Sequence, residues 1–399
     1  MSLPELYDLG DLSEFNLPPN TNLNQRVRLR KALYGLKQSP RLWNKEIDSF
    51  LKSKPLGFKQ STAEPNLYLT TDVIILLYVD DLQIFYKLQD KAEEVKKLLK
   101  GKYRMADLGP TQCFLGMNVD TTETSFALYQ TTYIESLLQR FSMTDAHGVD
   151  TPLDSHVSLE ITPNDSDKPA NQTEYLAIIG SLMYAALGTC PDISYAVNLL
   201  SRYNIDPRTR HLTAAKRVLR YLKKTKDLKL VYKELEDNLC GFVDADWANS
   251  VDRKLVGGYV FLLGGTAISW SSKKQSLVAL SIEEVRYTAF TEASRETLRL
   301  RQILLDIENR GDTGMSKTKL PGPIPIYADN QAAIKHAKSE GITARTKHFD
   351  IRLQHSRDLQ QKGILNLTYI KSSENTADIF TKGLPTPAHQ RHVKRLGLQ

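Results

Sequence analysis

Two adjacent aspartates, Asp80 and Asp81, follow an apolar run that is typical of a buried β-strand, Val73 to Tyr78. A second short strand pattern, Leu82 to Tyr86, begins directly after them, so we expect a β-hairpin with two carboxylates at its tip. Neighbouring carboxylates repel each other, and a purely structural hairpin more often ends in Asn-Gly or Asp-Gly. Carboxylate oxygens are also the ligands that Mg²⁺ prefers. The pair therefore indicates either a metal-binding turn or an ordinary polar turn.

Three further aspartates stand where strand patterns end or a helix pattern begins. Asp244 closes a strand pattern that starts at Gly241, Asp329 follows Ile324 to Ala328, and Asp378 begins the last helix pattern. Strands that end in acids and are mixed with helices predict an α/β layer with a carboxylate cluster at one edge. Such a cluster fits a two-metal phosphodiesterase. A single aspartate at such a position is usually only a helix cap, so the hypothesis depends on the whole set.

The helix pattern between His211 and Lys224 is the most basic in the chain. Beside an apolar stripe it carries five cations: Lys216, Arg217, Arg220, Lys223 and Lys224. A helix of this kind either has an ordinary solvated face or contacts a phosphate backbone. The residues alone leave both interpretations open.

Composition limits the class of protein. The chain has 399 residues, of which 41% are hydrophobic and 25% are charged, as in globular proteins of two or three domains. Its formal net charge of +7 suits a polyanionic partner. The three cysteines, Cys113, Cys190 and Cys240, have neither zinc-site nor disulfide spacing, which predicts a reducing intracellular compartment. We expect no signal peptide and no membrane span, and the oligomeric state stays open.

Helix and strand patterns alternate along the chain, which predicts a mixed α/β fold. The expected helices have an apolar period near 3.6 residues: 43–51, 87–102, 133–141, 175–187, 191–203, 211–224, 280–305 and 347–361. The expected strands outside the Asp80 hairpin are 241–246, 257–263, 267–270, 324–328 and 365–370. Residues 1–25, 150–172 and 311–323 lack both patterns, and we expect a poorly structured N-terminus, a surface connection and a loop there.

Three segments resemble a known family. The stretch Ala32 to Trp43, the sequence Tyr78-Val79-Asp80-Asp81 and the sequence Phe114-Leu115-Gly116-Met117 are similar, in order and spacing, to the reverse transcriptase of copia-type LTR retrotransposons. The resemblance implies that Asp80 and Asp81 are catalytic residues and metal ligands of the polymerase. It also implies a nucleotide- and template-binding segment and a primer grip, formed by Gly35, Lys37, Gln38 and Ser39 and by Phe114, Leu115 and Gly116.

Residues 241–384 resemble the RNase H domain that follows the polymerase in the same elements. The resemblance implies that Asp244, Asp329 and Asp378 are its catalytic residues and ligands of Mg²⁺ or Mn²⁺. The resemblance also places the basic helix in the thumb and connection, which favours contact with the phosphate backbone of a nucleic acid. The implied partners are an RNA template, a DNA primer, an RNA–DNA hybrid and dNTPs, without a membrane. The implied location is the cytoplasm, in virus-like particles, and also the nucleus.

The resemblance also implies the domain organisation. The expected fold is mixed α/β (α+β), with a truncated reverse-transcriptase palm, a helical thumb and connection, and an RNase H-like domain. The expected ranges are a poorly ordered N-terminus at 1–25, the palm at 26–122, the thumb and connection at 123–238, the RNase H-like domain at 239–385 and a basic tail at 386–399. The expected function is that of a Pol polyprotein fragment with RNA-directed DNA polymerase and RNase H activity.

Two departures from the family predict that both activities are impaired. The family's polymerase has a third carboxylate on an upstream strand, and neither Asp8 nor Asp11 lies in an apolar strand pattern that could supply it. In the RNase H part, Arg286 stands where the family has a glutamate. Glu283 or Glu284 could replace that glutamate, with a displacement of about one helical turn, roughly 5 Å.

Two other classes of function stay open. One is a non-catalytic, nucleic-acid-binding remnant of a decayed element, which the two departures favour. The other is an unrelated metal-dependent nuclease, which would keep the acids but would have no reason to keep the segment Ala32 to Trp43.

Overall fold

The computed structural model describes residues 32–33, 35–154, 157–161, 166–233, 239–246, 256–274, 282–309, 322–338 and 350–399. Its contacts divide these residues into two compact units, one that ends at Ala106 and one that begins at Asp107. The fold is mixed α/β, as the sequence predicts. Among the described helices, none combines the length and the apolar character that a membrane crossing requires.

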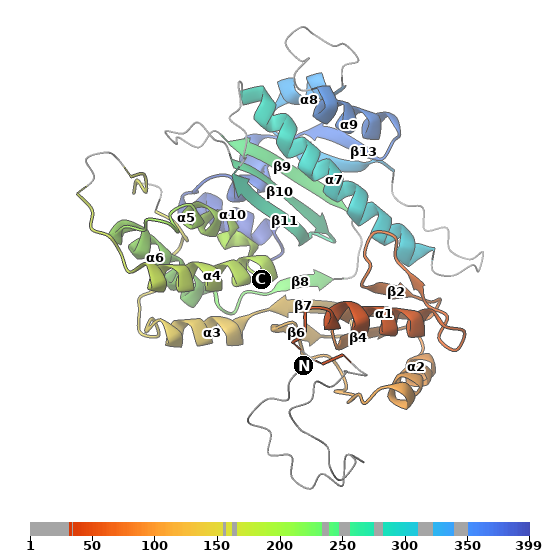
Figure 1. Cartoon of the computed structure of the whole chain (residues 1–399). Coiled ribbons are helices and arrows are strands. Elements are labelled where there is room, and N and C mark those ends of the chain that lie inside the picture. The colour runs from red at the N-terminus through yellow and green to blue at the C-terminus, as the bar shows by residue number, and fades with distance from the viewer. Residues whose placement is uncertain are drawn as a thin grey trace. The chain divides into compact units, whose positions relative to one another are not determined.

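The first unit is a four-stranded antiparallel sheet that packs with two helices (Figure 1). Its elements are α1 (Ser39–Lys52), β1 (Lys59–Gln60), β2 (Leu67–Leu69), β3 (Val73–Tyr78), β4 (Asp81–Tyr86) and α2 (Gln89–Lys102), with the strands in the order β1-β2-β3-β4. Alternate residues of β3, such as Ile75 and Leu77, face a core that also holds Ile47 and Leu51 of α1. Pro40 lies in the first turn of α1, where its missing N–H leaves no helical hydrogen bond unmade.

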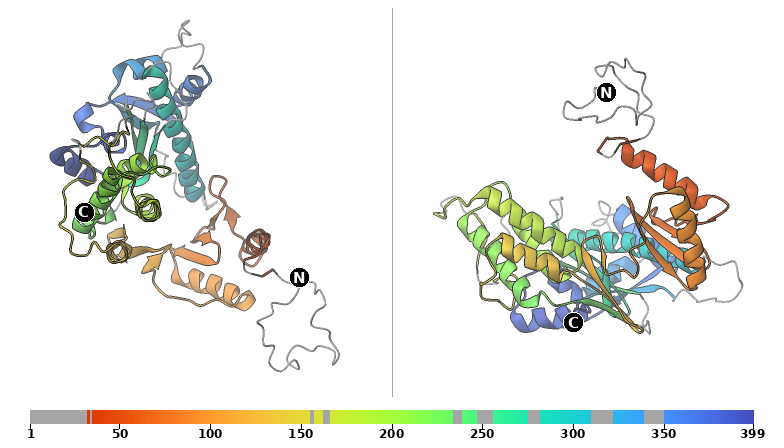
Figure 2. Two further views of the ribbon diagram at one scale, coloured as in Figure 1. Left: turned by 60° about the vertical axis from the view of Figure 1, so that its left-hand side comes forward. Right: turned by 90° about the horizontal axis from the view of Figure 1, so that it is seen from below.

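The second unit begins with a sheet whose last strand comes from far along the chain. Its antiparallel strands, in spatial order, are β5 (Cys113–Phe114), β6 (Met117–Thr121), β7 (Ser125–Tyr129) and β8 (Leu230–Lys233). The helices between β7 and β8 are α3 (Thr131–Arg140), α4 (Gln172–Gly188), the 3₁₀ helix η2 (Pro191–Ile193), α5 (Ser194–Ser201) and α6 (Thr209–Thr225). These helices lie side by side (Figure 2). They share one core, in which Tyr175, Leu182, Leu200 and Leu219 are fully buried.

A five-stranded mixed sheet forms the rest of the second unit. Its strands are β9 (Cys240–Asp246), β10 (Val256–Leu263), β11 (Thr266–Lys274), β12 (Ile324–Ala328) and β13 (Leu365–Tyr369), in the order β11-β10-β9-β12-β13. β12 is parallel to both of its neighbours, whereas β10 is antiparallel to β9 and β11. The long helix α7 (Ile282–Glu308) packs on this sheet (Figure 1), with Phe290 and Ala293 in its core. The remaining helices are α8 (Gln331–Lys338), α9 (Asp350–Gln361), the 3₁₀ helices η4 (Ser372–Glu374) and η5 (Thr376–Phe380), and α10 (Thr386–Arg395).

The structure also shows where some expectations need adjustment. The helix expected at Asp378 is the short 3₁₀ helix η5, and the range 386–399 contains α10 and the buried Leu396 and Leu398. Leu398 bridges to Leu230 of β8. The sheet β5–β8 runs across the expected boundary at residue 122, while the boundaries themselves stay predictions. Residues 1–25 and 311–321 lie outside the described residues.

Candidate active sites

The two aspartates of the first unit lie at the end of the β3–β4 hairpin, as predicted. Tyr78 pairs with Asp81, so the turn consists of Val79 and Asp80, and both acids are exposed. Val79 has a φ of 55°, which is unusual for a β-branched residue. The Trp43 indole Nε1 of α1 donates a hydrogen bond to the Val79 carbonyl oxygen. The strained turn is therefore tied to the helix that carries the Ala32 to Trp43 motif.

The residues expected to bind nucleotide and template surround the start of α1. Gly35 has a φ of 90°, and Gly35, Lys37 and Gln38 are exposed. Ser39 is buried instead, and its hydroxyl donates a hydrogen bond to the Leu33 carbonyl oxygen. Gly35, Lys37 and Gln38 are therefore accessible to a ligand, whereas Ser39 closes the turn that precedes the helix.

The expected primer grip is the tip of the β5–β6 hairpin, in the second unit. Phe114 pairs with Met117, and the two turn residues, Leu115 and Gly116, both have positive φ (51° and 72°). The Tyr184 hydroxyl of α4 donates a hydrogen bond of 2.7 Å to the Leu115 carbonyl oxygen. A side chain at position 116 would meet that hydroxyl, since an added Cβ would lie 2.2 Å from it. The hairpin is therefore held against α4 by Tyr184.

The five cations of α6 all have partners within the chain. Lys216 forms an ion pair with Glu174 at 2.8 Å. The other four contact the segment 146–154: Lys224 pairs with Asp150 at 2.5 Å, Arg217 contacts Thr151 and Asp154, Arg220 donates to the His147 carbonyl, and Lys223 donates to the Ala146 carbonyl. Contact of this helix with a phosphate backbone stays a prediction, and that its cations also anchor a distant segment was not predicted.

The three aspartates of the second unit converge, as predicted. β12 is parallel to β9 with Tyr327 opposite Phe242, so two residues further along lie Asp329 and Asp244. Asp378 reaches the same edge from η5, and one carboxylate oxygen of each acid lies within 4.8 Å of the others. Among the described residues, this is the one group of three or more acidic, histidine or cysteine side chains with metal-ligand spacing. Asp80 and Asp81 therefore have no third carboxylate beside them within the described part of the chain.

Two residues that were not predicted from the sequence position η5 against β9 and β10. The Asn375 amide donates to the Val243 carbonyl oxygen at 3.1 Å, and its carbonyl oxygen accepts from the Ala377 N–H, which caps η5. Gly258 of β10 pairs with Asp244, and an added Cβ at Gly258 would lie 2.7 Å from Cβ of Phe380 in η5. Gly258 therefore gives η5 the room to bring Asp378 beside Asp244. Its role depends on a cross-strand register, for which the sequence contains no local signal.

The carboxylates are oriented by neighbouring side chains. The Ser372 hydroxyl donates to Asp329 Oδ2 at 2.7 Å, and the Thr381 hydroxyl donates to Asp244 Oδ2. Lys382 Nζ lies 2.9 Å from Asp378 Oδ2 and 4.0 Å from Asp244 Oδ2. These residues were not predicted from the sequence, although Lys382 follows Asp378 by four positions, a spacing that can indicate an ion pair.

The cluster has the character of a metal site. Asp378 is 6% exposed, and burial together with the Asp244 carboxylate raises its pKa to about 7. Its Oδ1 atom is buried without a hydrogen-bond partner among the described residues. Unpartnered buried oxygens are rare in proteins, and hard carboxylate oxygens are the ligands of Mg²⁺ and Mn²⁺. Asp244, Asp329 and Asp378 therefore fit a divalent ion. The side chain of Arg286, on α7, lies outside the described residues.

Comparison with known proteins decides the family. A family model described as reverse transcriptase (RNA-dependent DNA polymerase) matches residues 15–155. The putative transposon Ty5-1 protein of Saccharomyces cerevisiae is 36% identical over 279 residues, which cover 66% of this chain and 87% of that protein. The chain belongs to the copia-type retrotransposon Pol family. The resemblance of the three motif segments is thereby confirmed.

Longer Pol proteins match nearly the whole chain. The Retrovirus-related Pol polyprotein from transposon TNT 1-94 of Nicotiana tabacum is 38% identical over 370 residues, which are 90% of this chain and 27% of the polyprotein. The chain thus spans about a quarter of the length of this Pol relative. Among solved structures, LC11-RNase H1 from compost matches with 12% identity and a TM-score of 0.28, over 39% of this chain and 98% of that one. Reverse transcriptases and RNases H as families use divalent metal ions.

Proposed function

We propose that Asp244, Asp329 and Asp378 form a metal-dependent site that cleaves the RNA strand of an RNA–DNA hybrid. The observation that supports this is the convergence of the three carboxylates, with ligand oxygens within 4.8 Å of one another, at the edge of a mixed α/β sheet. The resident ions are Mg²⁺ or Mn²⁺, held by these three side chains. When bound, such ions activate a water molecule and neutralise the charge that develops on the phosphate.

The chain's own residues fix the geometry of this site. Asp244 and Asp329 are partly exposed, so they face the side from which a nucleic acid can approach, and Thr381 and Ser372 fix their carboxylates. Asp378 is the buried member of the set, and burial together with the Asp244 carboxylate raises its pKa above the ordinary value. A bound cation would favour the carboxylate form of Asp378.

Arg286 reduces this activity in our proposal. A change from the family's glutamate to arginine reverses the charge from −1 to +1 at a position expected beside the ions. At an effective dielectric constant near 20, unit charges about 4 Å apart interact by about 4 kcal/mol, which is enough to outweigh small packing effects. An arginine that swings into solvent reduces this cost but still leaves the ligand missing.

Cleavage of a labelled hybrid by three proteins tests the proposal: the natural chain, Arg286→Glu, and Arg286→Glu with Asp329→Asn. A large gain in Arg286→Glu that Asp329→Asn abolishes supports the assignment of the site. If the natural chain already cleaves and Glu283→Gln stops it, the ligand has moved along α7 and the role given to position 286 is wrong. If no protein cleaves, the RNase H proposal fails.

We also propose that Asp80 and Asp81 are the remaining metal ligands of a polymerase site for an RNA template, a DNA primer and dNTPs. The hairpin and its motif support this role, whereas no third carboxylate joins them among the described residues. This lack of a third carboxylate among the described residues favours a second candidate function: a remnant of a decayed element that binds nucleic acid without polymerising. An intracellular location, in cytoplasmic virus-like particles and the nucleus, is part of the proposal. Its basis is the sequence, in which the spacing of Cys113, Cys190 and Cys240 fits neither a zinc site nor a disulfide framework.

A further inference from the structure

We propose that Lys382 is a built-in counter-ion of the carboxylate cluster, which holds Asp244 and Asp378 together before metal binds and competes with the metal for them. The inference rests on the proposed metal site and adds a positioning residue to it. Lys382 is not a metal ligand, because an ammonium group has no lone pair to offer. Its effect on the site is electrostatic.

The position of the ammonium group supports this role. Lys382 Nζ is 2.9 Å from Asp378 Oδ2 and 4.0 Å from Asp244 Oδ2, so it contacts one carboxylate and lies near a second. Three carboxylates whose oxygens lie within 4.8 Å of one another repel, and the repulsion is stronger where a side chain is buried, as that of Asp378 is. A cation between two of them reduces this repulsion. Part of the charge that a divalent ion would supply is therefore already present in the chain.

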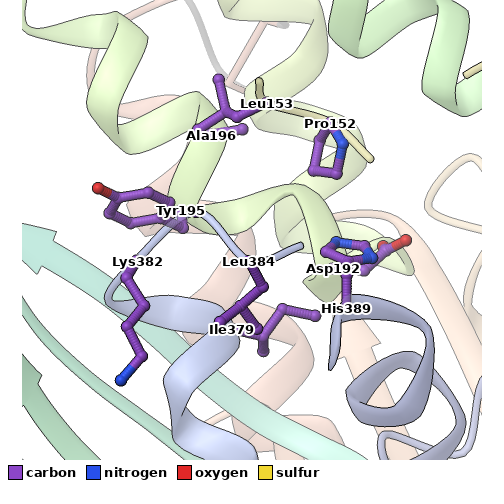
Figure 3. A pocket seen from close by; sticks show the side chains of 10 residues that line it. Pro152, Leu153, Asp192, Tyr195, Ala196, Ile379, Lys382, Leu384 and His389 are labelled. Carbon is purple, nitrogen blue, oxygen red and sulfur yellow. The ribbon is translucent and has the colours of Figure 1, made fainter. Parts of the chain in front are cut away.

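The stem of Lys382 directs the amino group to the cluster. The side chain forms part of the wall of a small pocket, together with Ile379 and Leu384 (Figure 3). Asp192 and His389 line the same pocket, but Figure 3 shows the Lys382 amino group pointing away from both. The backbone N–H of Lys382 also donates to the Asp378 carbonyl oxygen at 3.2 Å, which fixes the turn that carries the stem. The ammonium group is thus directed to the metal ligands and away from the buried Asp192.

Two opposite effects follow from one charge. Without metal, Lys382 stabilises the folded protein, because it offsets the repulsion among the acids. With metal, the same positive charge repels the incoming ion and occupies Asp378 Oδ2, one of the two oxygens that Asp378 can offer to the ion. Removal of the charge should therefore destabilise the metal-free protein and tighten metal binding. A lysine with only a packing role would change the stability and leave the metal affinity as it was.

The chain contains a matched control for this substitution. Lys362 forms an ion pair of 2.7 Å with Asp358, also four positions earlier, in the same unit. That pair is exposed and lies outside the carboxylate cluster. Lys362→Met removes the same charge and the same type of ion pair as Lys382→Met. The difference between the two variants therefore reports the effect of position.

The experiment measures Mn²⁺ binding to the full chain by calorimetry and the melting temperature in EDTA. We expect Lys382→Met to bind Mn²⁺ about tenfold more tightly than the natural chain. Even partly screened unit charges about 4 Å apart interact strongly enough to change the affinity by such a factor. Its melting temperature in EDTA should fall by a few degrees, roughly the effect of a single lost ion pair with a buried partner. Lys382→Arg should restore both values towards those of the natural chain, and Lys362→Met should leave the Mn²⁺ affinity unchanged.

The outcomes separate this inference from the function on which it rests. If the natural chain binds no Mn²⁺ that Asp329→Asn removes, the metal site itself is wrong, and the role of Lys382 falls with it. If that binding exists but Lys382→Met and Lys362→Met have equal affinities, the metal site stands and the competition by Lys382 is overturned. Weaker binding in Lys382→Met would also overturn it, because Lys382 would then assist the metal.

Discussion

The indole Nε1 of Trp43 donates a hydrogen bond to the carbonyl oxygen of Val79, the residue directly before Asp80. Val79 adopts a φ of 55° at the first position of a two-residue hairpin turn, where a turn with one positive φ usually has glycine. A left-handed conformation costs an L-residue roughly 1–2 kcal/mol, and more for a β-branched one. The hydrogen bond from Trp43 contributes to holding the turn in this conformation.

Substitution of Val79 tests whether the turn is strained. We expect Val79→Gly to raise the free energy of unfolding of the first unit by up to about 1 kcal/mol, because the relief of strain exceeds the added entropy of glycine in the unfolded chain. Val79→Ala keeps a Cβ at the same φ and serves as the control, with little gain expected. Denaturant titration measures both variants. A lower stability in Val79→Gly than in Val79→Ala would show that the turn stores no strain.

Primer extension on an RNA template tests the polymerase site. We expect weak or no extension with Mg²⁺ or Mn²⁺, since phosphoryl transfer needs ions clamped between carboxylates and only Asp80 and Asp81 are present at this turn among the described residues. The control is Asp80→Asn with Asp81→Asn. Extension clearly above that control would show that a third carboxylate is not required, or that Asp8 or Asp11 supplies it.

The carboxylate cluster could be predicted from sequence because local sequence patterns mark the positions of its members. Asp244 and Asp329 each follow a strand pattern, and the ends of parallel strands lie at one edge of a sheet. Asn375 and Gly258 could not be selected in the same way. Their roles depend on how η5 packs across β9 and β10, which is a property of strand register and not of any single segment. The pairing of Lys382 with Asp378 follows a local spacing of four positions, but its approach to Asp244 depends on the same packing.

The basic helix α6 shows a limit of prediction from sequence, because the partners of its cations lie far away along the chain. Its cations look unpaired along the sequence, because no acid stands three or four positions away to pair with most of them. In the fold, Arg220 and Lys223 bond carbonyl groups 73 and 77 positions earlier. Such contacts arise only when the helix and the segment 146–154 are placed side by side. A count of charges on one helix therefore overestimates the charge available to a partner.

Salt dependence measures how much of that charge contacts nucleic acid. We expect binding to an RNA–DNA hybrid to weaken with salt, with a slope of about −0.9 in log K per phosphate contact as for duplex DNA. Alanine at all five α6 cations should reduce both this slope and the stability, since Arg217, Arg220 and Lys223 also anchor the segment 146–154. A flat salt response, or a loss of stability with unchanged binding, would leave α6 with a structural role alone.

The buried Asp192 gives a pH dependence with a definite sign. Burial raises its pKa from 3.8 to about 6, although the Tyr221 hydroxyl donates a hydrogen bond to it. Between these two values the folded state binds more protons at this site than the unfolded state, so stability falls as pH rises. His389, whose pKa burial lowers to about 4, has the opposite effect over the range up to its ordinary value of 6.5. The two groups therefore oppose each other in the natural chain.

Asp192→Asn removes one side of this balance. Relative to the natural chain, we expect the stability of the variant to increase by roughly 2–3 kcal/mol as the pH rises from about 4 to about 7, since one pKa unit corresponds to about 1.36 kcal/mol. Asparagine keeps an oxygen that can accept the hydrogen bond from Tyr221. Denaturant titrations at several pH values measure the difference. A constant difference between the two proteins across this range would show that Asp192 does not titrate there.

Gly258→Ala tests whether close packing of η5 positions the metal ligands. The new Cβ would lie 2.7 Å from Phe380 Cβ and 3.0 Å from Thr381 Cγ2, so η5 must move away from β10. We expect a loss of about 1–3 kcal/mol in stability, as for other overpacked sites, and weaker Mn²⁺ binding because η5 carries Asp378.

The control for that substitution is Gly180→Ala on α4. An added Cβ there meets nothing within 4 Å, and alanine is the better helix former, so stability should rise by up to about 1 kcal/mol with no change in Mn²⁺ affinity. If Gly258→Ala loses stability but binds Mn²⁺ as the natural chain does, η5 tolerates the shift and close packing does not set the geometry of the cluster. If it loses neither, η5 accommodates the added Cβ without displacing Asp378, and the proposed role of Gly258 is wrong. Loss of both, with Gly180→Ala unaffected in binding, ties the position of Asp378 to the absence of a side chain at residue 258.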